Sequence, residues 1–504
     1  MPDQIASASA IAEEARPAPM RRVFKNAAVL MVAQVVAMPL SLVTNVVAAR
    51  YLGTDEFGLL ALASTFCSFG ALAVEWGQGG ALPALVAKDR TRAGITFGTA
   101  LVWRLSLAPL VYAVLALSCW KLGYTLDFHV ALALSMLGLL AWTTSGACQD
   151  AIRGFERTDV TAVIVVGTQL LNAAIGIPVF LLGGRLRAAL WVSVVVSAAG
   201  ALYAWRALRS IGGVRPSFER AALKRLLGDG TPFVALSASL MLQPMIDALF
   251  LSKLAPIEAT AWLAAAKRLV GVLALPATAL LNALYPTLSR LWHEDREGFR
   301  RSAGVGLQVS IALGVPLALG CFLYPDLGVR IYGRRSFGAA EDDLRVLSSF
   351  VLLLYFSMML GCWLSAAKLS RAWAACQLLC VAVSAVADPL LIPFCQSRFH
   401  NGSLGVCVST VLSEILMVAG GVWLAPPGVL TRSMWRAVRA ASISGGAMTG
   451  SAWAMSRITP FVAAPISVLV YLACLWMTGA LKSDDLALVR GVVARKFGSR
   501  GSSS

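Results

Sequence analysis

Apolar stretches long enough to cross a membrane follow one another along the whole chain, and only short polar segments separate them. The chain has 504 residues, of which 58% are hydrophobic and 14% are charged, whereas an ordinary soluble domain carries about 25% charged residues. The mean hydropathy is +0.74. This pattern predicts an all-α polytopic membrane protein with little length left for a soluble domain.

The apolar stretches predict about fourteen transmembrane helices, because each is close to the roughly 20 residues that one crossing needs. We place them at residues 26–48, 57–80, 95–119, 129–149, 160–182, 186–207, 232–252, 258–286, 304–325, 345–367, 372–394, 403–424, 436–456 and 459–480. Between the first two, Gly53 ends a helix and Thr54 caps the next, which predicts a tight hairpin.

Two lobes of six helices are expected. Residues 25–210 form the N-terminal lobe and residues 232–425 the C-terminal lobe, with 211–231 as an amphipathic cytosolic linker and 430–481 as two further helices. A shift of 202 residues brings Glu56 onto Glu258, each in a short acidic corner before an Ala-rich helix. This weak repeat suits two bundles related by a pseudo-two-fold axis along the membrane normal.

The ends of the chain are predicted to be cytoplasmic. Residues 1–24 are polar and lack the basic and apolar regions of a signal peptide, so we expect a disordered cytosolic tail, with a second tail at 482–504. The loops and tails on the same side of the membrane as the N-terminus carry more than twice as many Lys and Arg residues as the loops on the other side. Since Lys and Arg collect on the cytoplasmic side, this bias predicts that both termini are cytoplasmic. The same bias explains the net charge of +17, and no loop pairs a basic patch with aromatic residues as nucleic-acid binding requires.

The sequence contains few residues in the arrangements that catalysis or metal binding requires. The ten cysteines lie almost all in apolar runs without a C-x-x-C pair, and the three histidines are far apart. We therefore expect no enzyme, no metal site and no cofactor; the ions that we consider are H⁺ and Na⁺, at the intramembrane acids described below.

Charged residues within the predicted spans are the candidate functional residues, because an intramembrane charge is costly unless it faces protein or water. Arg104, Lys267 and Arg268 are near mid-depth in spans three and eight, and we predict that they line a cationic substrate cavity. Arginine offers a fork of donors that suits an anionic phosphate. The alternatives are a structural ion pair for each arginine and, for Lys267, a side chain that snorkels.

Four acids and three amides complete the predicted site. The acids are candidates for ion coupling: Glu75, Asp247, Asp388 and Glu414, of which Glu414 is the most isolated. The alternatives are a cap or a Lys88 pair for Glu75, a Lys253 or Arg268 pair for Asp247, and a plain proline kink at Asp388. The polar residues Gln34, Asn45 and Asn172 are predicted to line the cavity or to join helices.

Five segments in a fixed order carry a resemblance to a known family. They are AARYLGTDEFGLLALAS, EWGQGGALPALVAK, PFVALSASLMLQPMIDALFLSKL, AAAKRLVGVLALPATALLNALYPTLSRL and GSLGVCVSTVLSEILMVAGGVWL. Together they resemble the polysaccharide exporter and O-antigen flippase branch of the multidrug/oligosaccharidyl-lipid/polysaccharide flippase superfamily. The resemblance covers nearly the whole chain as a pattern.

The resemblance implies a transporter that works by alternating access. Its expected substrate is an undecaprenyl-pyrophosphate-linked oligosaccharide, moved across the bacterial inner membrane for exopolysaccharide, capsule or lipopolysaccharide O-antigen synthesis. Expected partners are membrane lipids, a polysaccharide polymerase and its co-polymerase. Two alternatives stay open: a drug or metabolite antiporter, although span one lacks an acid, and a membrane polysaccharide polymerase, although only the loop at 325–345 is charged enough.

Overall fold

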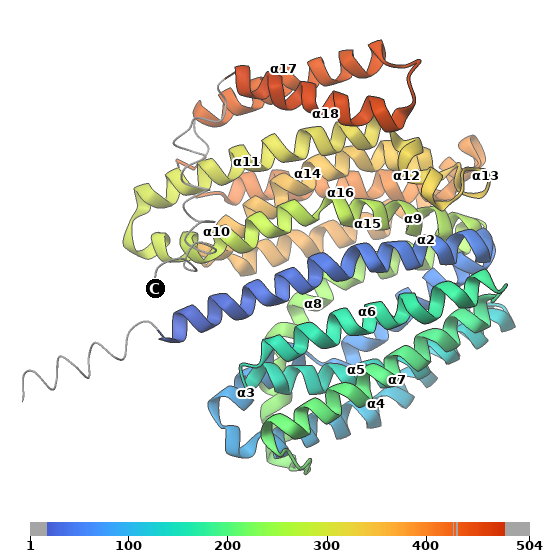
Figure 1. The fold of residues 1–504 in the computed structure, drawn as a ribbon, viewed down its shortest axis with the longest axis vertical. Coiled ribbons are helices and arrows are strands. Elements are labelled where there is room, and N and C mark those ends of the chain that lie inside the picture. Colours follow the sequence, from blue (N-terminus) through green and yellow to red (C-terminus); the bar gives the residue numbers. More distant parts are fainter. Residues whose placement is uncertain (1–17, 427, 430–431, 479–504) are drawn as a thin grey trace, which may run out of the picture.

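The computed structural model describes residues 18–426, 428–429 and 432–478, which form helices joined by short turns. The first lobe contains α2 (Ala18–Glu75), α3 (Gln78–Lys88), the 3-10 turn η1 (Arg90–Arg92), α4 (Ala93–Lys121), α5 (Leu126–Gly154), α6 (Thr158–Leu181) and α7 (Leu186–Gly212). In Figure 1, α4, α5, α6 and α7 form one group of helices, and the N-terminal half of α2 runs between this group and the rest of the molecule.

The second lobe follows a short connection. It contains α8 (Arg220–Leu254), α9 (Ile257–Leu273), α10 (Leu275–Glu294), α11 (Arg296–Leu323), α12 (Pro325–Tyr332), α13 (Arg334–Phe337), α14 (Ala340–Ala366), α15 (Ser370–Phe399) and α16 (Gly402–Leu424). The last two helices, α17 (Arg432–Ala454) and α18 (Pro460–Met477), pack on the outer side of α11 (Figure 1).

Helix α2 folds back on itself at Gly53, whose backbone has φ 74° and ψ −179°. A glycine adopts this positive φ without the steric cost that a Cβ would add. The predicted hairpin is therefore present, and the chain then alternates in direction through both lobes. We call the end of the molecule with Gly53 and the α8–α9 turn the corner end, and the opposite end, with residues 213–219, the linker end.

The helices of the described residues agree with about fourteen crossings. Ten helices are long and apolar enough to span a membrane, or twelve if the bent pairs within α8 and at α9–α10 each count as one. The stretch Val32–Lys88 counts once there although Gly53 folds it into two crossings, and the Arg-bearing α17 runs between α16 and α18 without meeting that criterion. The predicted fold class of about fourteen transmembrane helices is confirmed.

Two predicted boundaries differ from the structure. Helix α2 begins at Ala18, so residues 18–24 are helical rather than part of a disordered tail, because Met, Arg and Lys in this basic stretch favour helix. Residues 1–17 and 479–504, which include the predicted C-terminal tail, lie outside the described residues. The predicted linker 211–231 is non-helical only over residues 213–219, and from Arg220 onward it is continuous with span seven as α8.

The first half of α8 is attached to the first lobe. The backbone nitrogen of Glu219, the residue before this helix, donates to Thr99 Oγ1 at 3.1 Å, and the Ser217 nitrogen donates to the Gly94 carbonyl at 3.2 Å. Farther along, Gly230 is in close backbone contact with Gly77. Since α8 then bends by 44° between Ser239 and Met241, the two lobes join inside this helix rather than in the loop before it.

The close contact at Gly77 predicts a sharp effect of one methyl group. A Cβ at Gly77 would lie 2.1 Å from the Gly230 carbonyl oxygen, at a φ of +67°, whereas a Cβ at Gly79 has no atom within 4 Å. We expect Gly77→Ala to lower the free energy of unfolding by about 1–3 kcal/mol, and Gly79→Ala to leave it unchanged or slightly raised. Thermal unfolding of the purified variants in detergent measures this, and equal midpoints for the pair would contradict the assigned contact.

Candidate functional site

A break in the second membrane crossing forms the first polar site. Helix α2 ends at Glu75, Trp76 and Gly77 take φ values of 43° and 67°, and α3 starts at Gln78. This left-handed turn directs the side chains on both sides of the break toward α4. Broken helices are typical of the sites of membrane transporters because they free polar groups within the membrane.

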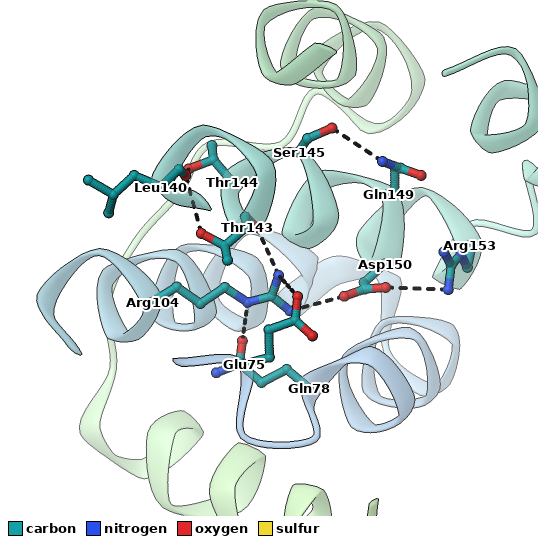
Figure 2. A network of polar contacts seen from close by, with 10 residues as sticks. All are labelled: Glu75, Gln78, Arg104, Leu140, Thr143, Thr144, Ser145, Gln149, Asp150 and Arg153. Atoms are coloured by element: carbon teal, nitrogen blue, oxygen red, sulfur yellow. Dashed lines mark hydrogen bonds and ion pairs between the residues drawn. The ribbon is translucent and has the colours of Figure 1, made fainter. Parts of the chain in front are cut away.

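Arg104 of α4 fills the space beside the break and is fully buried. Its Nε donates to Gln78 Oε1 at 2.8 Å, Nη1 to the Thr143 carbonyl at 2.8 Å, and Nη2 to Asp150 Oδ2 at 3.0 Å (Figure 2). The nearest oxygen of Glu75 lies 3.9 Å from Nη1. The guanidinium thus joins α2, α3, α4 and α5 through one buried group.

The donors of Arg104 are occupied by protein in this conformation. Within this network Glu75 is the most accessible residue, with a side chain that is 29% exposed. Asp150 has a second partner, since its carboxylate lies 3.5 Å from Arg153. A substrate role for Arg104 stays a prediction, and the geometry gives it a clear structural role: a buried ion pair that fixes the broken helix. Glu75 pairs with Arg104 rather than with Lys88.

Asp150 and Gln78 were not among the predicted site residues. Asp150 lies at the end of span four in the segment GACQDAIRG. An acid three residues before an arginine at a helix end suggests an ion pair at the surface, here with Arg153. Its position inside an otherwise apolar run was the available signal. Gln78 carries no charge, so only the break in the helix reveals its role.

A second polar site lies within the second lobe. Lys267 Nζ of α9 is 2.7 Å from Asp247 Oδ2 of α8, and Asp247 Oδ1 accepts a hydrogen bond from Ser384 of α15 at 3.1 Å. Asp388, one turn farther along α15, is fully buried and has Asp247 and Lys267 as its charged neighbours. The structure therefore brings together Asp247, Lys267 and Asp388, which the sequence predicted as separate candidate site residues.

The other predicted charges lie apart from this cluster. Arg268 is the one exposed residue of α9 and has no ion-pair partner among the described residues. Glu414 of α16 is half-buried and accepts a hydrogen bond from Ser357 of α14. Adjacent helix positions point about 100° apart, which is why Lys267 enters the lobe while Arg268 faces out of it.

The three predicted amides occupy different surroundings. Gln34 is exposed on α2, and Asn172 is half-buried on α6. Asn45 donates to the Ser41 carbonyl of its own helix at 2.8 Å. The structure does not gather these residues around one group, and their role in lining a cavity stays a prediction.

Contacts at the corner end hold the two lobes together. Arg50 donates from Nε to the Ile331 carbonyl at 2.6 Å and from Nη2 to the Arg330 carbonyl at 3.0 Å. Lys253 donates to the Leu122 carbonyl at 2.6 Å and lies 3.4 Å above the ring centre of Tyr124. These are polar contacts between separately packed helix bundles.

A buried apolar layer reinforces this closure. Phe57 of α2 and Phe337 of α13 meet edge to face with ring centres 6.0 Å apart. Next to them, Gly58 approaches Ile257 and Thr260 of α9 so closely that a Cβ there would lie 2.5 Å from the Ile257 carbonyl oxygen. The structure is therefore closed at the corner end.

Two helical lobes, a broken helix and buried charges within apolar spans are the architecture of a membrane transporter. The model of the family described as "Polysaccharide biosynthesis protein" matches residues 23–292, and the MatE model matches residues 232–390. The first match covers more than half of the chain. The chain belongs to the polysaccharide biosynthesis protein family of the multidrug/oligosaccharidyl-lipid/polysaccharide flippase superfamily, as its sequence pattern predicted.

Solved structures share the fold at low sequence identity. The lipid II flippase MurJ in an inward closed conformation is 13% identical with a TM-score of 0.70, covering 90% of this chain and 99% of MurJ. A multidrug resistance MATE transporter in an inward-facing conformation is 14% identical with a TM-score of 0.63, covering 77% and 94%. An outward-facing MATE structure gives 13% and a lower TM-score of 0.52, covering 79% and 95%. No match was found among curated protein sequences.

The Arg104 network predicts a large stability effect of one substitution. Arg104→Met leaves the buried carboxylate of Asp150 without its main partner, and we expect a loss of about 3–5 kcal/mol. The double variant Arg104→Met with Asp150→Leu removes both charges and should recover most of this loss. The measurement is thermal unfolding in detergent, followed by tryptophan fluorescence.

Arg153→Met provides the control, because its side chain is 40% exposed and also pairs with Asp150. We expect a change of at most about 1 kcal/mol for this outer partner. A double variant as unstable as Arg104→Met alone would show that Arg104 does not act through Asp150.

Proposed function

We propose that this protein flips undecaprenyl-pyrophosphate-linked oligosaccharides across the bacterial inner membrane by alternating access, for the assembly of a surface polysaccharide. Membership of a polysaccharide biosynthesis family supports a saccharide cargo. The shared fold with a lipid II flippase supports a lipid-linked one. A polymerase and its co-polymerase are then the proteins that would receive the flipped unit.

Arg268 is the observation that carries this proposal. It lies about eleven residues into α9, well inside a bent membrane crossing, and it is exposed without an ion-pair partner among the described residues. A cation at this depth is costly in lipid, so it must face water or an anionic ligand. A pyrophosphate supplies the acceptor oxygens that match the guanidinium fork.

The arrangement of the lobes supports alternating access. The N-terminal half of α2 packs along α9, with the Met38 methyl 4.0 Å from where a Gly271 Cβ would lie. The lobes are held at the corner end, which the predicted topology places on the periplasmic side. Release of the contacts made by Arg50 and Lys253 would open that end while each lobe keeps its own core.

Substitution of Arg268 tests the proposed substrate contact. A charge-assisted hydrogen bond contributes about 1.5–3 kcal/mol, so Arg268→Ala should slow flipping by about tenfold or more. Lipid-linked repeat units should accumulate on the cytoplasmic side while the protein remains in the membrane. Arg268→Lys should be intermediate, because it keeps the charge and loses the fork.

Arg290→Ala is the matched control, since Arg290 is a 65% exposed arginine of α10 that pairs with Glu294. The measurement is the amount of lipid-linked repeat units in intact cells against those exposed at the outer leaflet. Equal transport by Arg268→Ala and Arg290→Ala would remove Arg268 from the substrate site.

The corner-end contacts predict a measurable opening. Arg50→Met removes two hydrogen bonds, each contributing about 0.5–1.5 kcal/mol. A Thr260→Cys reporter, at a position 6% exposed, should then react several-fold faster with a charged thiol reagent in a background lacking the native cysteines. Arg187→Met is the control, because Arg187 pairs with Asp127 inside the first lobe at the same end. An unchanged rate in Arg50→Met would show that these bonds do not hold the lobes closed.

A further inference from the structure

A cavity of about 540 Å³ lies between α6 and α7 at the linker end of the first lobe. These two helices pack side by side (Figure 1). Helix α6 lines the cavity with Arg157 and Val160, and α7 lines it with Tyr203, Arg206, Ala207 and Ser210. Four of these six residues, both arginines among them, are exposed, so the cavity opens on the surface of the lobe.

The packing of α6 against α7 explains why this space is present. The helices approach closely at Gly200, where a Cβ would lie 3.0 Å from Thr168 Cγ2. About two turns farther toward the linker end, the cavity is lined by the small side chains of Val160 and Ala207. A larger side chain at Ala207 would therefore fill the cavity without changing its charge.

Arg206 gives the cavity a net positive charge. Among the described residues it has neither an ion-pair nor a hydrogen-bond partner. Arg157, by contrast, binds both oxygens of Asp159 at 3.1 Å, and the two charges cancel. Glu156, the other acid before α6, lies 3.6 Å from Arg90. The nearby acids thus have arginine partners of their own, and Arg206 is left to attract an anion.

The cavity lies at the level expected for lipid headgroups. Val160 is the first residue of predicted span five and Ala207 the last residue of predicted span six, and the predicted topology makes this end cytoplasmic. Leu202 and Val195 follow one and three turns from Arg206 on the same face of α7, and they are 50% and 51% exposed. An anionic group bound at Arg206 would therefore have an apolar helix face beside it, as acyl chains require.

The polar groups of the cavity suit a phosphate that carries a hydroxylated headgroup. The guanidinium of Arg206 offers a fork of donors to phosphate oxygens. The exposed hydroxyl of Tyr203 has no hydrogen-bond partner among the described residues and adds a further donor. The Ser210 hydroxyl donates to the Ala207 carbonyl at 2.8 Å, so its oxygen is available to accept from a hydroxyl of the headgroup.

We propose that the cavity between α6 and α7 binds the headgroup phosphodiester of an anionic phospholipid from the cytoplasmic leaflet. Basic pockets between transmembrane helices on the cytoplasmic side are of the type that holds anionic headgroups. The site belongs to the first lobe alone, whereas the proposed substrate contact Arg268 lies on α9 of the second lobe. It is therefore independent of the proposed function.

Lipid titration of the purified full-length protein in detergent tests this site, with native mass spectrometry to count the bound molecules. Phosphatidylglycerol should bind about fivefold more tightly than zwitterionic phosphatidylcholine, because one arginine near the membrane surface contributes about that factor. Arg206→Gln should remove this preference. Arg209→Gln is the matched control and should keep it, because Arg209 lies over the Trp205 ring, one turn away on the same helix and outside the cavity.

Ala207→Phe tests the cavity itself, since it fills the space and leaves every charge in place. It should lose the preference for phosphatidylglycerol as Arg206→Gln does, and Arg206→Gln decides the question alone if Ala207→Phe fails to fold. Equal losses in Arg206→Gln and Arg209→Gln would reveal a general attraction to a basic surface and overturn the site. Full preference in a folded Ala207→Phe would overturn it as well. Glycerol phosphate binding as tightly as phosphatidylglycerol would make this a site for a soluble phosphate and overturn the lipid assignment.

Discussion

The placement of charge inside the membrane is the constraint on which this structure depends. Lipid offers no partner to a buried ion, so each must find one within the protein or face a space that holds water or ligand. Arg104 satisfies the first requirement with three hydrogen bonds to separate segments. Arg268 lacks such partners among the described residues, and this contrast separates a structural cation from the one that we propose contacts the substrate.

Hydropathy was sufficient to predict the fold, but the sequence did not predict which charged residues pair with one another. Apolar length and Gly53 specify crossings and the hairpin because each is a local requirement of a helix in a membrane. The partner of Arg104 depends on which helices pack together, and Asp150 is separated from it by 46 residues. A lone sequence offers no measure of that proximity.

The same limit applied to the second lobe. Asp247, Lys267 and Asp388 were each recognised as intramembrane charges, but the predicted partners for Asp247 were Lys253 and Arg268. The structure sends Lys253 to Leu122 in the first lobe and leaves Lys267 for Asp247. Helical phase alone allows either Lys267 or Arg268 to face inward, and packing of α9 against α8 and α16 decides between them.

The continuity of α8 determines how the two polar sites relate to motion between the lobes. Its first half is fixed to the first lobe at Gly77, and its second half carries Asp247 into the second lobe. The ion pair of Asp247 with Lys267 therefore lies on a helix that reaches both lobes. That helix bends between Ser239 and Met241, within two turns of Asp247. The Asp247–Lys267 pair thus lies beside the bend that joins the lobes, whereas the Arg104 network lies within the first lobe alone.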